Sequence, residues 1–207
     1  MSNEDLPIIM GILNCTPDSF SDGGLFLDAD KAVKQALKMH QEGASIIDIG
    51  GESTRPNAAP VSADEELSRI VPVIKRIQDA SNVKISVDTS KPLVMKQVLD
   101  LGVSMINDVN ALEEKGAIDV IAKASCQVCL MHKKGVPQSM QDNPHYHNVV
   151  EEVMTYLKQR TLACFDKGID RQRIILDVGF GFGKTPAHNL SLIKQLEKFQ
   201  ALGLSNF

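Results

Sequence analysis

The sequence has 207 residues, of which 43% are hydrophobic and 23% are charged, as is usual for one soluble globular domain. Its formal net charge of −4 supplies no basic surface of the kind that a nucleic-acid backbone requires. The first residues resemble neither a signal peptide nor a transit peptide, and no apolar run is long enough to span a bilayer. We therefore expect a single domain over residues 1–207 that binds neither nucleic acid nor membrane.

The cysteines and histidines are scattered and do not form a recognisable metal motif. Scattered cysteines in a chain of this size favour reduced thiols and a cytoplasmic protein over a disulfide framework. Cys126 and Cys129 have the spacing of half a zinc site, but no second pair follows, so we interpret them as core residues of a strand. His132, His145 and His147 could ligate a metal, although we interpret this cluster as a solvated loop.

Short apolar runs alternate along the chain with longer amphipathic stretches, which is the pattern of repeated βα units. We count six units. Strands this apolar, separated by helices, indicate a parallel sheet covered on both faces. The predicted strands are 8–13, 46–49, 85–87, 105–106, 128–131 and 174–176, and the predicted helices are 31–40, 65–77, 93–101, 117–124, 149–165 and 190–199.

Local signals agree with this division. Ser62 and Glu65 have the spacing of a capping box at the start of the second helix. Glycines follow three of the helical stretches and predict their ends, at Gly43, Gly102 and Gly168. One face of the fifth helix is predicted to be buried because its apolar residues recur at helical spacing, namely Val150, Val153, Met154, Leu157, Thr161 and Cys164.

Two α/β architectures are compatible with these units. A doubly wound open sheet suits the length, whereas a (β/α)₈ TIM barrel typically needs about 250 residues. Polar residues favour the barrel, because they end successive strands and would meet at one mouth. These residues are Asn14, Asp48, Asp88, Asn107 and Asp177.

Three loops that follow strands have compositions typical of binding loops. Residues Asn14–Gly24 are rich in turn residues, and the Asn14 carbonyl oxygen could contact a hard cation. Residues Gly50–Pro56 combine glycines, hydroxyls and Arg55, which suits an anion such as phosphate, although a solvated turn has a similar composition. Residues Gly179–Lys184 permit close backbone approach but match neither a P-loop nor a dinucleotide motif.

Acidic and amide side chains at neighbouring strand ends suggest recognition of a planar heterocycle. Asp88 and Asn107 end successive strands, and Asp177 adds a second acid. Together they offer donors and acceptors that could orient an amino-pyrimidine edge. The alternative is that such residues cap helices, and we predict that role for Ser90, which precedes Lys91 and a proline.

Six ordered motifs together resemble the dihydropteroate synthase family, and the resemblance covers almost the whole chain. The motifs are Met10–Gly24 (MGILNCTPDSFSDGG), Gly50–Pro56 (GGESTRP), Ser86–Pro92 (SVDTSKP), Ile106–Asp108 (IND), Cys129–His132 (CLMH) and Asp177–Lys184 (DVGFGFGK). The resemblance implies a TIM barrel and a transferase of folate biosynthesis. That enzyme joins 7,8-dihydropterin-6-ylmethyl diphosphate to p-aminobenzoate, with Mg²⁺ held on the pyrophosphate.

The same resemblance implies roles for individual residues. Catalytic roles are implied for Arg55, Asp88 and Asp177, and Asn14 corresponds to the Mg²⁺ contact. The implied substrate-binding residues are Phe20, Thr54, Arg55, Pro56, Asp88, Asn107, Met131, Asp177, Gly181 and Phe182. Pro17, Phe20 and Pro56 would lie in loops that close over p-aminobenzoate. A homodimer is also implied.

The sequence differs from the family pattern in three ways. Cys15 and Val178 replace the more usual valine and proline, which are mild changes. The Ser-Arg-Lys-Ser strand and the Arg-x-His segment, which carry a pterin-contacting lysine and pyrophosphate ligands in the family, do not occur in residues 1–207. We therefore expect an incomplete barrel without the last two βα units, marginally stable because of its open edges. Its anion site would be weakened.

Two other interpretations remain open at this point. The chain could be an inactive relic, or a module that binds pterin without catalysis. It could also belong to the pterin-binding methyltransferase barrels, although the first loop and the Ser-Thr-Arg-Pro element argue against that class.

Overall fold

The computed structural model describes residues 7–16, 25–53, 60–135, 140, 143–202 and 205–206, with the backbone alone at 25–28 and 205–206. The six predicted βα units are present, and a short seventh strand follows them. The strands are β1 Met10–Asn14, β2 Ile46–Gly50, β3 Lys84–Asp88, β4 Met105–Asp108, β5 Gln127–Met131, β6 Ile174–Asp177 and β7 Ser205–Asn206. The helices are α1 Leu25–Gln41, α2 Ala63–Ala80, α3 Pro92–Asp100, α4 Ala117–Ala122, α5 Val149–Asp166 and α6 Pro186–Lys194, with 3₁₀ segments at Arg171–Arg173 and Leu196–Leu202.

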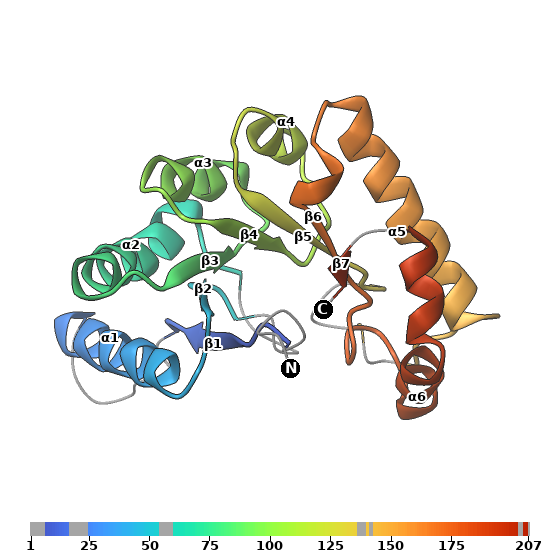
Figure 1. Ribbon diagram of the computed structural model, residues 1–207, viewed down its shortest axis with the longest axis horizontal. Helices are drawn as coiled ribbons and strands as arrows, with labels where there is room; N and C mark the ends of the chain where they lie inside the picture. The colour runs from blue at the N-terminus through green and yellow to red at the C-terminus, as the bar shows by residue number, and fades with distance from the viewer. Residues whose placement is uncertain are drawn as a thin grey trace, which may run out of the picture.

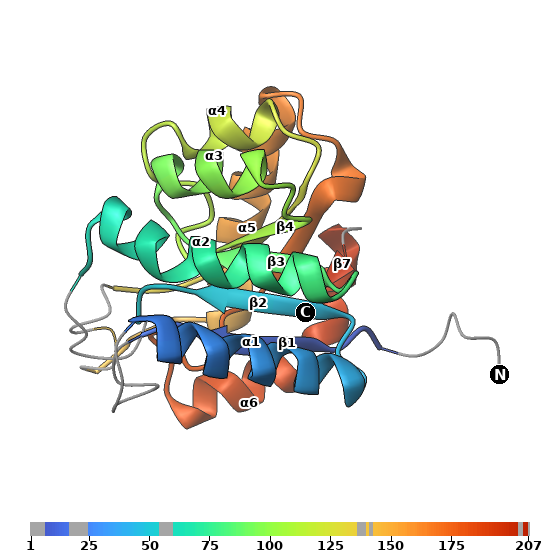
Figure 2. The same ribbon diagram turned by 90° about the vertical axis from the view of Figure 1, so that its left-hand side faces the viewer.

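All seven strands form one parallel sheet in the order β1-β2-β3-β4-β5-β6-β7. This sequential order is that of a βα barrel and excludes the doubly wound alternative, whose strand order reverses at a switch point. Figure 1 shows the strands as an arc with α1 to α4 on its outer side. Within the described residues the arc is open, with β1 and β7 at its two edges. From the side, α1 and α2 lie in front of β1, β2 and β3 (Figure 2).

The predicted helix signals are largely confirmed. The Ser62 side chain caps α2 by accepting a hydrogen bond from the backbone N–H of Glu65. Gly43, Gly102 and Gly168 have φ angles of 114°, 83° and 79°, which is the left-handed conformation that ends a helix. The predicted inner face of α5 is buried, with Met154 partly so.

Three local predictions were wrong. The first strand begins at Met10, because Ile8 and Ile9 precede the sheet and are exposed. The last helix begins at Pro186 and has a Thr185 cap, because its N-terminus is set by that capping box and not by the apolar residues further along. Ser90 is not a cap, since α3 follows Lys91 without a side-chain cap hydrogen bond.

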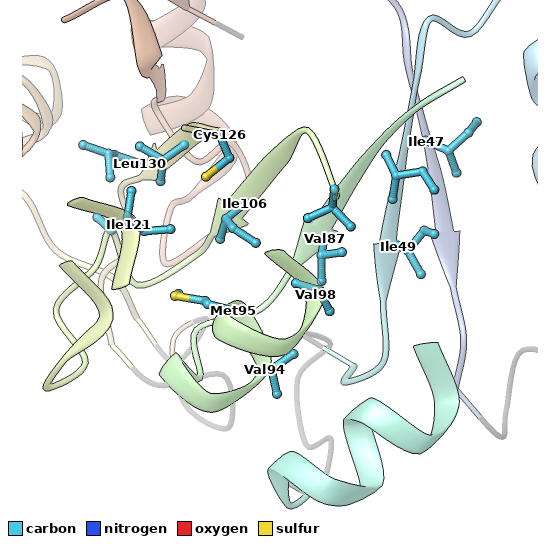
Figure 3. Packing of buried hydrophobic residues seen from close by; sticks show 14 of the residues in the cluster. Ile47, Ile49, Val87, Val94, Met95, Val98, Ile106, Ile121, Cys126 and Leu130 are labelled. Atoms are coloured by element: carbon cyan, nitrogen blue, oxygen red, sulfur yellow. The ribbon is translucent and has the colours of Figure 1, made fainter. Parts of the chain in front are cut away.

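Side chains on the outer face of the sheet form the main hydrophobic core. Successive strand residues point to opposite faces, so Ile47, Ile49, Val87, Ile106 and Leu130 all point outward to the helices. Figure 3 shows this layer packing against Val94, Met95 and Val98 of α3 and Ile121 of α4. Burial of this apolar surface fixes the register of each strand, because a one-residue slip would expose it.

The inner face of the sheet has a much smaller apolar layer, consisting of Met105, Cys129 and Ile175 with Met10 packed against it. Ile12, on the inner face of the edge strand β1, is 67% exposed. The remaining inner positions near the carboxyl ends of the strands are polar. No helix in the described part of the chain is long and apolar enough to cross a membrane.

Candidate functional site

The site lies on the inner face of the sheet, where neighbouring strands place polar residues in adjacent rows. Asp88 pairs in register with Gly50 on one side and Asn107 on the other. Asp48 pairs with Ser86, two residues earlier on the same strands. Because side chains alternate between the faces, all four side chains point into the arc. We call Asp48, Ser86, Asp88 and Asn107 the inner acidic face.

Three polar atoms of the inner acidic face lack partners. The Asn107 Nδ2 donates to Asp48 Oδ2 at 2.9 Å. By contrast, Asp48 Oδ1, Ser86 Oγ and Asn107 Oδ1 are buried, and none has a hydrogen-bond partner within the described residues. Asp48 is only 4% exposed and Ser86 is fully buried. Buried polar atoms are normally hydrogen-bonded, so this cluster is a candidate for ligand binding.

Negative charge accumulates on this side of the site. Burial, and then the charge of Asp48, raise the pKa of Asp88 well above its ordinary range. Burial also raises the pKa of Asp48, while the Ser86 hydroxyl and the Asn107 amide act in the opposite direction. Perturbed carboxyl groups of this kind cluster at functional sites. They favour a ligand that offers hydrogen-bond donors.

Asn14 lies beside this cluster at the end of β1, where it pairs in register with Gly50. A Cβ atom on Gly50 would lie 3.6 Å from Asn14 Oδ1 and 3.7 Å from Asp88 Oδ2. Both side-chain oxygens therefore face the space in front of this glycine. The Asn14 side chain is exposed there, so its carbonyl oxygen is accessible.

The opposite side of the site is formed by β5, β6 and the loop after β6. Met131 ends β5, is buried, and pairs with Asp177 at the end of β6. The Gly179 N–H donates to Asp177 Oδ1 at 2.7 Å. Burial raises the pKa of Asp177, while that hydrogen bond and the positive charge of Lys184 act in the opposite direction. Cys129 lies between the two sides, because it pairs in register with Asn107 of β4 and with Ile175 of β6. Burial, and then the charges of Asp177, Asp48, Asp108 and Asp88, raise the pKa of its thiol.

Residues Gly179–Lys184, the glycine loop, pack closely against the end of β5. Gly179, Gly181 and Gly183 have φ angles of 67°, 81° and 64°. A Cβ on Gly179 would lie 1.9 Å from the carbonyl oxygen of His132, so only glycine can occupy this position without displacing backbone. Gly181 and Phe182 are thereby held at the rim, where Gly181 is exposed and Phe182 partly exposed.

Lys184 closes the glycine loop from within and does not reach out as a phosphate ligand. Its Nζ donates to the carbonyl oxygens of Gly179, Phe182 and His132 at 2.8, 3.1 and 3.2 Å. The His132 Nδ1 lies 3.0 Å from the same nitrogen. Burial, opposed by the charge of Asp177, lowers the pKa of Lys184 to about 7.

The expectation of a solvated histidine loop was therefore wrong for His132 and correct for the other two. His132 is 5% exposed and packs edge-on against Tyr156, because the strand carries it under the glycine loop. His145 and His147 are exposed. Cys126 and Cys129 are buried, as predicted for strand-core residues. The described residues contain no group of three or more His, Cys, Asp or Glu side chains that could hold a metal.

An ion-pair cluster lies next to the inner acidic face and had not been predicted. The Lys91 Nζ bonds to Glu52 Oε2, and lies 2.7 Å from an oxygen of the fully buried Glu66. Glu52 also accepts from the backbone N–H of Val61 at 3.2 Å. Lys91 thereby fixes the segment that follows β2 onto α2 and the start of α3.

The prediction that Asp48 ends a strand was wrong, because β2 continues to Gly50 and Asp48 lies in the middle of it. Neither Asp48 nor Ser86 was assigned a substrate-binding role from the sequence. The signal that could have found them is periodicity: both lie two residues before a residue at a strand tip, on strands that are otherwise apolar. An acid inside the run Ile46–Gly50 must be buried, and a buried acid needs a partner.

Several predicted site residues lie outside the described residues, namely Pro17, Phe20, Thr54, Arg55 and Pro56. Asp88, Met131 and Asp177 end β3, β5 and β6, and Asn107 lies one residue before the end of β4. Asn14, Gly181 and Phe182 lie at the same end of the sheet. A groove also occurs between α3 and α4, at the amino ends of β4 and β5, where its lining includes Lys96, Asp100, Asp119 and Lys123. It lies at the other end of the strands and lacks the unpartnered buried atoms of the inner face, so we place no site there.

The arrangement is suited to binding and orienting a flat heterocycle. Asp88 and Asn107 provide hydrogen-bond acceptors on the inner acidic face, and Met131 provides an apolar contact surface at the end of β5. Oxygen from Asn14 faces the open side. None of the described cysteines is suited to act as a nucleophile, because each is buried and burial raises its pKa.

Comparison with known proteins agrees with this geometry. Residues 10–206 match the family described as pterin binding enzyme. The chain is 50% identical over 198 residues to dihydropteroate synthase of Haemophilus influenzae, covering 96% of this chain and 72% of that protein. Identity to the Escherichia coli dihydropteroate synthase is 48%, with coverage of 96% and 70%.

Solved structures give the same result. The dihydropteroate synthase of Xanthomonas albilineans with 4-aminobenzoic acid superposes with a TM-score of 0.91 at 46% identity, covering 98% of this chain and 72% of that one. The same enzyme in complex with 7,8-dihydropteroate gives a TM-score of 0.87 at 42% identity, with coverage of 98% and 71%.

Proposed function

The chain belongs to the dihydropteroate synthase family of pterin-binding enzymes, and from this premise we propose that it joins 7,8-dihydropterin-6-ylmethyl diphosphate to p-aminobenzoate. The products are 7,8-dihydropteroate and pyrophosphate, so the reaction is a transferase step of folate biosynthesis. The observation that supports this most is the inner acidic face, where Asp88 and Asn107 pair in register on neighbouring strands and the buried Asn107 Oδ1 has no partner among the described residues.

In the proposed reaction the amine nitrogen of p-aminobenzoate attacks the methylene carbon of the pterin. The carbon–oxygen bond breaks, pyrophosphate leaves with the electron pair, and the amine loses a proton. A carbon with such a leaving group needs little covalent assistance, so orientation and stabilisation of the departing charge dominate. We propose that Asp88, Asn107 and Asp177 hold the pterin edge, while Met131, Gly181 and Phe182 pack around the ring.

The leaving group requires positive charge, which the inner acidic face does not offer. We propose that Thr54 and Arg55 bind the phosphates and part of the p-aminobenzoate, with Phe20 and Pro56 beside it. Arg55 would act catalytically together with Asp88 and Asp177. These roles follow from the family motifs at matching positions.

We also propose Mg²⁺ as the cofactor, with Asn14 as its protein contact. Mg²⁺ is bound in proteins through few protein oxygens together with substrate phosphates and water. The exposed Asn14 oxygen beside Gly50 suits that chemistry. When bound, the ion would neutralise charge on the departing pyrophosphate. A cytoplasmic location and a homodimer complete the proposal, and the four buried free cysteines are compatible with a reducing compartment.

A second candidate is pterin binding without catalysis. It is favoured by one observation: the buried polar atoms of the inner acidic face that have no partner among the described residues suit binding of the ring and include no positive group for the leaving phosphates. We further propose that residues 1–207 act as a single pterin-binding barrel domain, in which a seventh strand follows six βα units. The chain spans 72% of the Haemophilus influenzae relative.

One experiment separates the two candidates. The 207-residue chain is incubated with the pterin pyrophosphate and Mg²⁺, with and without p-aminobenzoate, and both dihydropteroate and pyrophosphate are measured. Release that requires p-aminobenzoate supports the transferase. Pterin binding without product supports the binding module. Pyrophosphate release that ignores p-aminobenzoate would contradict the transferase assignment.

A further inference from the structure

The contact between Asp48 and Asn107 extends the candidate site by one residue. Asp48 belongs to β2 and Asn107 to β4, so the hydrogen bond of 2.9 Å from Asn107 Nδ2 to Asp48 Oδ2 crosses above the intervening strand β3. Asp48 lies one inward-facing position below the row of Asp88 and Asn107. It therefore lies behind the ring-binding residues and contacts one of them directly.

This contact determines the orientation of the Asn107 amide, that is, the positions of its oxygen and its nitrogen. A carboxamide has a donor end and an acceptor end of nearly equal shape, and its environment decides which way it points. Oδ2 of Asp48 accepts the Nδ2 hydrogen whether or not Oδ1 carries a proton. The amide nitrogen is thereby engaged, and Asn107 Oδ1 is left buried without a partner in the described structure.

A purely structural role does not account for Asp48. Asp48 is 4% exposed, its Oδ1 has no hydrogen-bond partner among the described residues, and Asp88 lies close enough for the two charges to interact. Burial of a carboxylate without a cation destabilises a fold. The described residues provide no ion pair to Asp48 that would offset this cost.

We propose that Asp48 is a positioning residue of the pterin site, which holds the Asn107 amide so that Oδ1 is presented as an acceptor to an N–H of the ring. The pterin edge carries several N–H donors, and a flipped amide would place its own donor against them. Misorientation would therefore replace an attraction by a repulsion. This inference rests on the proposed function, because it assumes that the ring binds at Asn107.

The test is a double-mutant cycle read by calorimetric titration with 6-hydroxymethyl-7,8-dihydropterin. Asp48→Ala should weaken binding about tenfold, which corresponds to about 1.4 kcal/mol. In an Asn107→Ala background, the same change should alter affinity by less than about twofold, because Asp48 acts through the amide that is absent. Asp48→Asn keeps an acceptor for Asn107 Nδ2 and should recover part of the loss.

The matched control is Asp79→Ala, which removes an acidic side chain from an exposed position on α2, away from the inner acidic face. It should bind the pterin as the parent chain does. Thermal unfolding of each variant shows whether it is folded. If Asp48→Ala does not fold, Asp48→Asn replaces it in the double-mutant cycle, and the expected loss of affinity is then smaller.

The outcomes separate this inference from the proposed function. Parent-like affinity in the Asp48 variants, or equal losses with and without the Asn107 side chain, would overturn the positioning role and leave the proposed function intact. Failure of the parent chain to bind the pterin would overturn both.

Discussion

The two sides of the inner face differ in how their polar groups are satisfied. On the β2 to β4 side, Asp48, Ser86 and Asn107 each bury an atom that has no partner among the described residues. On the β5 to β6 side, Lys184 alone makes three hydrogen bonds to carbonyl oxygens, and Asp177 accepts one from the glycine loop. Both sides lie at the same end of the same sheet.

We interpret this difference as one between residues that bind the ligand and residues that stabilise the fold around the site. Unpartnered buried groups cost folding free energy, and a ligand with matching groups can recover it. Fully satisfied groups instead fix a loop in one conformation. We therefore expect substitutions on the β2 to β4 side to change affinity more than stability, and substitutions around the glycine loop to do the reverse.

The largest stability effect is expected for Gly179→Ala. The new Cβ would meet the His132 carbonyl oxygen at 1.9 Å, at a φ of 67°, and the combined clash and strain should cost about 3–5 kcal/mol. Gly181→Ala is the matched control, because its φ is also positive but its Cβ would meet nothing within 4 Å. It should cost about 1–2 kcal/mol. Denaturant unfolding measures both, and equal losses would refute the packing of the glycine loop.

The next largest effect is the loss of pterin affinity in Asp88→Asn. Replacement of the carboxyl group that we propose as an acceptor for the ring should weaken binding about 10- to 100-fold. The melting temperature should not fall, because a buried negative charge beside Asp48 is removed. Asp79→Asn, at an exposed position on α2, controls for charge. Calorimetric titration measures the affinity of each variant, and thermal unfolding measures its stability. A drop in stability with unchanged affinity would contradict the expectation that the β2 to β4 side contributes to binding more than to stability.

On the β5 to β6 side, the buried His132 should make the free energy of unfolding depend on pH. Burial, and then the charge of Lys184, lower its pKa from 6.5 to about 3. Between these values the unfolded chain binds a proton that the folded chain does not. The free energy of unfolding should therefore fall as the pH falls from 6.5, by up to about 1.4 kcal/mol per pH unit, with no contribution above 6.5.

His132→Asn, which keeps an acceptor near Lys184, should remove this slope. His145→Asn, at an exposed position, should keep it. Chemical denaturation at several pH values measures the slope in each. An unchanged slope in His132→Asn would mean that this histidine is not held neutral.

The smallest effects compare two buried hydroxyls, one on each side. The Tyr146 hydroxyl donates to the Gly183 carbonyl oxygen at 2.9 Å, so Tyr146→Phe should cost about 1–2 kcal/mol by leaving that carbonyl unpaired. The Ser86 hydroxyl lies near Asp48 but makes no hydrogen bond of normal geometry within the described residues, so Ser86→Ala should change stability by about 0.5 kcal/mol at most. Equal costs would show that the two sides are satisfied to the same degree.

The fold was largely predictable from the sequence. Alternation of apolar runs with helical periodicity located all six βα units, and Gly43, Gly102 and Gly168 marked real helix ends. Residues alone could not decide between an open sheet and a barrel, because strand order depends on packing between units and not on local patterns. The boundary errors at Ile8 and Ser90 arose where apolar or capping residue types lie just outside an element.

The site was predictable only in part. Strand-tip residues such as Asp88 and Asn107 stood out because each follows an apolar run. Asp48 needed the register of three strands before its contact with Asn107 could be seen. Lys184 was suggestive as a charge after glycines, but only the fold shows that its ammonium group turns inward to the carbonyl groups of its own loop.

The most direct test of the account is a crystal structure of the chain with the dihydropterin bound. We predict that the amino-pyrimidine edge lies on the inner acidic face, within hydrogen-bond distance of the Asp88 carboxylate and Asn107 Oδ1, with the ring against Met131. A ring bound in the groove between α3 and α4, or elsewhere with the inner acidic face empty, would contradict it.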